Sequence, residues 1–456
     1  MLPTQPHSAM RWFGFSAAGV YGQRGGWQVG PLGIKHVIGS LLLVGLISFR
    51  FQSGDAAKHL SSGDVDRANS ALNQLLDSAP APLYASAASE ALPKPLGPRE
   101  LPPYAPPKAK VVLIGQGGQI RAAIATVDTL HIPDDSQRVI RHAVSAVTEL
   151  TPQQVLVVAN HSHAGPRLPG GVAVRLAYGD PEIKHSQLLN LFDTVTRKAL
   201  RHYAPARLGL AEAPLPNYVG GRAKGAQVSI DNVLRLAVLQ SDRQRIVLWS
   251  FAAHPTLVHR HHKHADGDYP ARVAHLLKLE KDADEAVFLP GLTAQATPAT
   301  VRQVDDYAAL IASAISGLVI LATNTMQSEA NVNALELEVE VDAALPLPGL
   351  GRPFVLAPWA TARLGSSDRR VKLVQLGPLR LVALPGEPSH ALMGGSAKTS
   401  WVLGMAGFGM GYLVPPEDAH RHPERDLVLL GASDTQRVKE LVQILRDGGD
   451  LSRFDQ

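Results

Sequence analysis

Two histidines separated by a single residue, His161 and His163, follow an apolar run at 155–159 that predicts a buried strand. In extended backbone, residues i and i+2 point to the same side. Both imidazoles could therefore reach one metal ion, or one could bind a metal while the other acts on a substrate. Two surface histidines that meet by chance would give the same pattern, so the site needs further donors.

Three more motifs offer such donors at the ends of predicted elements, where α/β proteins place their chemistry. His254 closes a predicted buried strand at 244–253, Glu387 lies in the turn 385–388 after another strand, and Tyr412 follows a glycine. Each residue also has a purely structural interpretation. His254 could be a hydrogen-bonded histidine of the core, Glu387 could cap the next helix, and Tyr412 could be a packed aromatic ring.

Zinc is the metal that suits this set of side chains. The chain contains no cysteine, which excludes disulfides, thiolate metal sites, iron–sulfur clusters and cysteine nucleophiles. Nitrogen and oxygen donors that leave one position open for water or substrate are typical of catalytic Zn²⁺. Such an ion activates water and polarises a carbonyl, so the chemistry indicated is hydrolysis.

Two other motifs are expected to lie outside the site. The segment 259–264 (HRHHKH) holds four histidines in six residues, and we expect an exposed loop that binds metal only adventitiously. The turn 115–118 (GQGG) resembles part of a dinucleotide-binding loop, but its glycine spacing is wrong and a strand follows it. We interpret it as a hairpin turn.

The region 109–456 alternates predicted strands and helices, which indicates an α/β (mixed α+β layered) domain with a metal site at its strand ends. Strands are predicted at 109–114, 121–127, 155–159, 244–253, 286–289, 371–376 and 379–384. Helices are predicted at 136–148, 186–202, 304–326 and 435–447.

Residues 1–57 are typical of a signal or membrane-anchor segment. An uncharged apolar run of 13 residues at 37–49 follows a stretch, 1–35, with three basic residues and no acid. A helix of that length is shorter than the hydrocarbon core, which favours a signal h-region; a buried core helix is the alternative. We expect export, with the protein periplasmic or anchored in a membrane and facing away from the cytoplasm.

The net charge of +4 does not indicate a nucleic-acid partner. Residues 1–35 hold +3 of it, and the rest of the chain has no basic run interleaved with aromatic residues.

Residues 58–108 are predicted to be a short helix followed by a proline-rich linker. Apolar residues at helical spacing favour a helix in 58–77. The stretch 78–108 contains nine prolines, a density that blocks helix and central strand alike. The folded domain is therefore expected to begin near Ala109.

The order of these motifs resembles the catalytic domain of neutral (alkaline, non-lysosomal) ceramidases over about 110–430. Asp128 also stands where that family has an acid after its second strand. The matching motifs are His-x-His-x-Gly-Pro at 161–166, Ala-x-His-Pro-Thr at 252–256, Asp-Tyr-Pro at 268–270, Leu-Pro-Gly-Glu-Pro at 384–388 and Gly-Tyr at 411–412.

The resemblance implies a role for each candidate residue. It implies a zinc ion held by His161, His254, Glu387 and Tyr412. His163 would lie beside the scissile amide, where it stabilises or shuttles charge, and Arg222 would contribute to substrate binding. The implied reaction is attack of zinc-activated water on the amide of an N-acyl (sphingo)lipid, which releases a fatty acid.

Some segments depart from the family pattern. The turn 290–298 (PGLTAQATP) lacks the family's Gly-Asp and the serine that true ceramidases use, residues 407–409 (GFG) replace an Asn-x-Tyr, and a C-terminal β-sandwich domain is not expected. The leading hypothesis is a zinc-dependent amidohydrolase that acts on an N-acyl lipid or another linear acyl amide. The alternatives are a divergent envelope protein that binds metal or lipid without turnover, and one whose histidines are purely structural.

Overall fold

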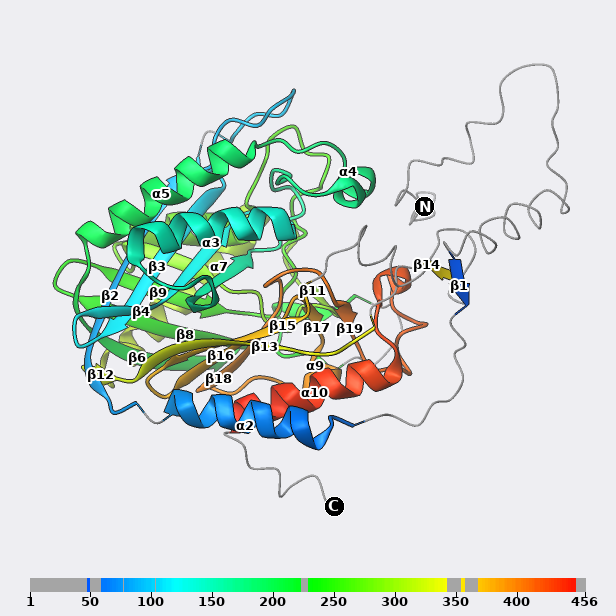
Figure 1. The fold of residues 1–456 in the computed structure, drawn as a ribbon. Coiled ribbons are helices and arrows are strands. Elements are labelled where there is room, and N and C mark those ends of the chain that lie inside the picture. The colour runs from blue at the N-terminus through cyan, green and yellow to red at the C-terminus, as the bar shows by residue number, and fades with distance from the viewer. Residues whose placement is uncertain are drawn as a thin grey trace, which may run out of the picture.

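The computed structural model describes residues 47–49, 59–76, 78–102, 104–222, 229–342, 354–356 and 368–447 (Figure 1). The predicted signal or anchor segment lies outside the described residues, apart from the short strand β1 (Ile47–Phe49). This strand pairs with β14 (Phe354–Leu356).

A nine-stranded sheet forms the centre of the fold. Its strands follow the order β10-β9-β8-β6-β2-β3-β4-β5, and β12 pairs with β2. Neighbours are antiparallel, except for the parallel pairs β4–β5 and β9–β10. The strands are β2 (Ala81–Ala91), β3 (Lys108–Gln116), β4 (Gln119–Val127), β5 (Val155–Ala159), β6 (Ala204–Pro214), β8 (Val233–Ser241), β9 (Arg245–Ser250), β10 (Glu285–Phe288) and β12 (Glu329–Ala330).

The sheet curls so that strands far apart in its order approach each other. The Nζ of Lys110 in β3 donates to the carbonyl of Ala286 in β10 over 2.9 Å. The hydroxyl of Ser89 in β2 donates to Glu285, also in β10, over 2.9 Å. A flat sheet would hold β2 and β10 about 19 Å apart, because neighbouring strands are spaced about 4.8 Å. The curl brings the segment after β9 to the segment after β5.

Helices cover the large sheet. In Figure 1, α3 (Asp134–Thr148) and α5 (His185–Arg201) lie side by side, and α5 packs against β2 and β3. Leu188, Leu191 and Val195 place an apolar stripe of α5 against the strands, as helical spacing predicts. The helices α6 (Asp268–Leu279) and α7 (Val304–Thr323) pack against each other, and α7 packs against β6 and β8.

A second sheet lies between the large sheet and two further helices. It contains β13 (Val332–Glu338), β15 (Arg370–Leu376), β16 (Leu379–Ala383) and β18 (Ser400–Leu403). Alternate residues of its strands face opposite sides. Val374 and Leu381 join the core of the large sheet, whereas Leu373 and Val382 pack with α2 (Ser62–Leu76) and α10 (Ala432–Asp447). Figure 1 shows these two helices beneath the second sheet.

Shorter elements lie near the ends of the strands. They are α4 (Val172–Tyr178), α9 (His390–Met393), the pair β7 (Val219–Gly221) with β11 (Ala296–Pro298), the pair β17 (Gly386–Pro388) with β19 (Gly411–Leu413), and two 3₁₀ turns at Pro152–Gln154 and Arg425–Leu427.

The predicted elements of the body are confirmed, with small shifts at their ends, and the fold is a mixed α/β architecture with several sheets. The glycine turn at 115–118 joins two antiparallel strands, as expected of a hairpin. Gly117 and Gly118 have φ of 59° and 84°, a region that favours glycine.

The prediction of a linker over 78–108 was wrong. Residues 81–91 form β2, an inner strand of the large sheet, and α2 packs against the second sheet, so the fold begins well before Ala109. The prolines stand at 80, 82 and from 93 onward, which leaves 83–92 free of proline. A count over the whole stretch concealed this gap.

Among the described residues, α7 is long and apolar enough to cross a membrane by length and composition. Tyr307, Ile311, Ile315 and Val319 lie on its buried face. Core helices that pack against a sheet commonly have this composition.

Candidate metal centre

The structure brings the predicted site residues together from four segments. His161 and His163 follow β5, His254 follows β9, Glu387 lies in β17, and Tyr412 lies in β19. Strands β17 and β19 run parallel, and Glu387 and Tyr412 are direct partners across the pair. These segments are far apart in sequence. The strands β5 and β9 belong to the large sheet, whereas β17 and β19 form a separate two-stranded sheet.

The segment 266–267, directly before α6, holds the histidine loop in place. The side-chain amide of Asn160 donates to the Gly267 carbonyl over 3.1 Å, and the hydroxyl of Ser162 donates to the Asp266 carbonyl over 2.6 Å. His161 itself has φ of 68°, a left-handed conformation that non-glycine residues rarely adopt. The loop therefore holds strain that its neighbours must offset, as is common at functional sites.

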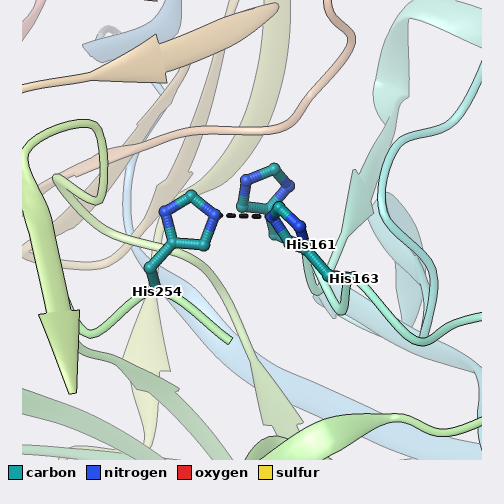
Figure 2. Close-up of side chains that lie close together, drawn as sticks. All are labelled: His161, His163 and His254. Atoms are coloured by element: carbon teal, nitrogen blue, oxygen red, sulfur yellow. Dashed lines mark hydrogen bonds between the residues drawn. The ribbon is translucent and has the colours of Figure 1, made fainter. Parts of the chain in front are cut away.

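Three imidazoles form the centre of the cluster, as Figure 2 shows. The Nε2 atoms of His163 and His254 are 2.8 Å apart, and the rings of His161 and His254 have centroids 4.4 Å apart. One nitrogen from each of the three histidines lies within 4.8 Å of the others, close enough to hold one metal ion. His161 and His254 are buried, and His163 is partly exposed.

Electrostatics keep two of the three imidazoles neutral. Burial lowers the pKa of His254 well below its ordinary value, and the positive charge of Arg222 acts in the same direction. Burial and the neighbouring His161 likewise lower the pKa of His163. Neutral imidazole is the form that binds a metal ion.

Glu387 supplies a buried carboxylate beside these rings. Its two oxygens lie 3.0 Å from Nε2 of His161 and 3.6 Å from Nδ1 of His254, with only 1% of the side chain exposed. Both Oε2 of Glu387 and Nε2 of His161 are buried, and neither atom has a hydrogen-bond partner among the described residues. Buried polar atoms are rarely left this way, and a cation held between them would satisfy both.

The ring of His161 is oriented from outside the cluster. Its Nδ1 lies 2.8 Å from the Leu130 carbonyl, to which only a protonated nitrogen can donate. In the neutral ring this leaves Nε2 unprotonated and directed at Glu387, the tautomer that a metal-binding histidine requires. When no cation is bound, burial opposes protonation of this ring, but the Glu387 charge outweighs it and raises the pKa of His161.

Arg222 lies beside the histidines and joins them to Tyr412. Its NH1 lies 3.4 Å from Nδ1 of His254 and donates to the Tyr412 hydroxyl over 3.2 Å. The Tyr412 hydroxyl also contacts Glu424, and NH2 of Arg222 donates to Glu424 over 3.1 Å. Burial and the Glu387 charge raise the pKa of Tyr412 well above its ordinary value, so the phenol is protonated.

Two of these groups were not found by sequence reasoning. Glu424 lies in a charged stretch, 417–426, where nothing separates it from surface acids. The Leu130 carbonyl carries no sequence signal, because a backbone oxygen is the same in every residue. The histidines of 259–264 are mostly exposed and lie outside the cluster, as expected.

Comparison with known proteins identifies the fold. A crystal structure of neutral ceramidase from Pseudomonas aeruginosa superposes with a TM-score of 0.63 at 13% sequence identity, over 82% of this chain and 75% of that one. A structure of a ceramidase complexed with C2 superposes with a TM-score of 0.64 at 13% identity, over 82% and 76%. No protein-family model and no curated protein matches the sequence. The chain has the fold of neutral ceramidases.

Proposed function

We propose that this protein is a zinc-dependent amidohydrolase that cleaves an N-acyl (sphingo)lipid or a related linear acyl amide. The observation that carries the proposal is the buried group of His161, His254 and Glu387, in which Nε2 of His161 and Oε2 of Glu387 make no hydrogen bond to any described residue. The ceramidase fold supports an amide as the bond that is cleaved.

In this proposal some of the residues bind the metal and others act on the substrate. His161, His254 and Glu387 hold zinc, and Tyr412 is the fourth ligand because it neighbours Glu387 across the β17–β19 pair. A bound zinc ion activates water and polarises the amide carbonyl. His163, the most exposed of the three imidazoles, would take a proton from the attacking water and pass it to the departing amine.

Arg222 contacts the substrate. Burial opposes its charge, but Tyr412, Glu424 and Glu387 outweigh this effect and raise the pKa of the guanidinium further. The side chain therefore keeps a fixed positive charge beside the site, where it can stabilise negative charge that develops on the carbonyl oxygen.

Metal content tests the metal centre first. The full chain, with the histidines of 259–264 replaced by glutamine to remove adventitious binding, should contain one zinc ion by elemental analysis. His254→Ala and Glu387→Ala should lose the ion, and the exposed control His202→Ala should keep it. Absence of zinc in the parent protein, even after reconstitution, would overturn the proposal.

Two further variants separate the fourth ligand from the proton-transfer group. Tyr412→Phe should weaken zinc binding, whereas His163→Gln should keep zinc and lose the release of fatty acid from N-acyl amides. Zinc loss on His163→Gln alone would make His163 a ligand instead. One bound zinc without hydrolysis of any acyl amide would favour a metal-binding protein without turnover.

A further inference from the structure

Glu424 lies in direct contact with Arg222, the arginine next to the metal centre. Its Oε2 accepts from NH2 of Arg222 over 3.1 Å and also contacts the Tyr412 hydroxyl. The side chains of Arg222 and Glu424 form an ion pair. Arg222 and Glu424 are thus a charged pair with no net charge.

Exposure increases outward from the metal centre to this pair. The side chains of His254 and Glu387 are 0% and 1% exposed, whereas those of Arg222 and Glu424 are 16% and 36% exposed. The Arg222–Glu424 pair therefore lies between the buried donors and the solvent. A substrate that enters from this side passes the pair on its way to the metal centre.

The pair determines which charge a substrate can carry at that point. Without Glu424, NH2 of Arg222 would lose its acceptor, and the guanidinium could donate to a carboxylate of the substrate instead. With Glu424 in place, one edge of the guanidinium is occupied, and a second carboxylate would meet the charge of the first. An uncharged head group meets neither penalty.

We propose that Glu424 is a specificity-determining residue that makes the site prefer acyl amides with an uncharged amine portion and reject those that carry a carboxylate, such as N-acyl amino acids. This inference rests on the proposed function, because it assumes that an acyl amide binds with its carbonyl at the metal centre.

Equilibrium binding of two hydrolysis-resistant probes tests the inference. The probes are N-octanesulfonyl ethanolamine and N-octanesulfonyl glycine, which differ only in a hydroxymethyl group against a carboxylate. Calorimetry on the zinc-loaded full chain should show preference for the ethanolamine probe. Glu424→Gln should shift the affinity ratio toward the glycine probe by about tenfold, the value of one partly screened charge. Glu424→Ala should shift it in the same direction.

Two controls connect the shift to this pair of charges. Glu417→Gln removes an exposed acid of the same segment and should leave the ratio unchanged. Arg222→Gln combined with Glu424→Gln removes both charges and should return the ratio close to that of the wild type.

The possible outcomes separate this inference from the proposed function. An unchanged ratio in both Glu424 variants would overturn the inference alone, as would an elevated ratio in the double variant. If neither probe binds any zinc-loaded variant, the acyl-amide substrate class is refuted and the inference with it.

Discussion

Replacing Asp268 with asparagine should change how the stability of the fold depends on pH. The Asp268 carboxyl is 0% exposed at the start of α6 and accepts hydrogen bonds from the backbone of Val258 over 2.7 Å and of Tyr269 over 2.6 Å. Burial raises its pKa from 3.8 to about 7. The residue follows the segment 266–267, whose carbonyls accept hydrogen bonds from Asn160 and Ser162 of the histidine loop. Ionisation of Asp268 therefore takes place next to the contacts that hold this loop.

The sign follows from proton binding in the two states. Between pH 4 and pH 7 the unfolded chain has released the Asp268 proton and the folded chain keeps it. The contribution of Asp268 to the free energy of unfolding therefore falls as pH rises through the folded pKa. A difference of about 3 pKa units at about 1.4 kcal/mol each gives a loss of about 4 kcal/mol by pH 8.

Asparagine removes the titration and adds a constant cost. Its amide group can accept only one of the two backbone hydrogen bonds, which costs about 1–3 kcal/mol at every pH. Asp268→Asn should therefore be less stable than the wild type at pH 4, and the difference should close and reverse in sign towards pH 8.

Urea denaturation of both proteins from pH 4 to pH 8 measures this difference. The exposed acid Asp306 offers a matched control, since Asp306→Asn should follow the wild type across the range. A difference between wild type and Asp268→Asn that stays constant within about 1 kcal/mol would refute the reasoning, as would one that changes in the opposite direction.

Three further predictions concern the packing and the metal. Lys372→Met removes a buried partner 3.0 Å from Asp368 and should lower the free energy of unfolding by about 3 kcal/mol in urea denaturation; an unchanged midpoint would contradict it. Gly165→Ala places a methyl group 2.6 Å from Cα of Thr129 and should destabilise by about 1–3 kcal/mol with weaker zinc binding, whereas full retention of both would show that the loop can adjust. A chelator should lower the thermal midpoint of the wild type and leave that of His161→Ala unchanged. A metal present at a hundred times its Kd stabilises the folded state by about 2.7 kcal/mol, and the chelator should remove that stabilisation. Equal shifts in both proteins would place the metal elsewhere.

Strands and helices of the body could be predicted because their burial is periodic or continuous. The run at 155–159 is buried at every position, and the apolar stripe of α5 recurs at helical spacing. The inner strand β2 could not be predicted in this way. Its sequence is rich in alanine and serine, residues that give little strand signal, and prolines stand on both sides of it.

Some residues of the candidate site could be predicted from the sequence, and others could not. His161, His254 and Glu387 could be selected because their types and their positions after apolar runs are visible in the sequence. The meeting of His161 and His254 depends on the curl of the large sheet, which long-range contacts such as that of Lys110 with Ala286 accompany. Glu424 is distinguished from other acids of its segment only by its contacts with Arg222 and Tyr412.

The place of β2 in the large sheet sets the order in which the site can form during synthesis. Among the described strands, β2 links the half that leads to β5, and so to His161, with the half that leads to β9, and so to His254. β2 pairs with β3, which follows closely, and with β6, which begins more than 100 residues later. The N-terminal half of the sheet must therefore leave the ribosome with one edge of β2 unpaired, a state that exposes strand backbone to association with other chains. His161 and His254 lie on opposite sides of β2 in the strand order, so the candidate site can form only after that edge has been covered.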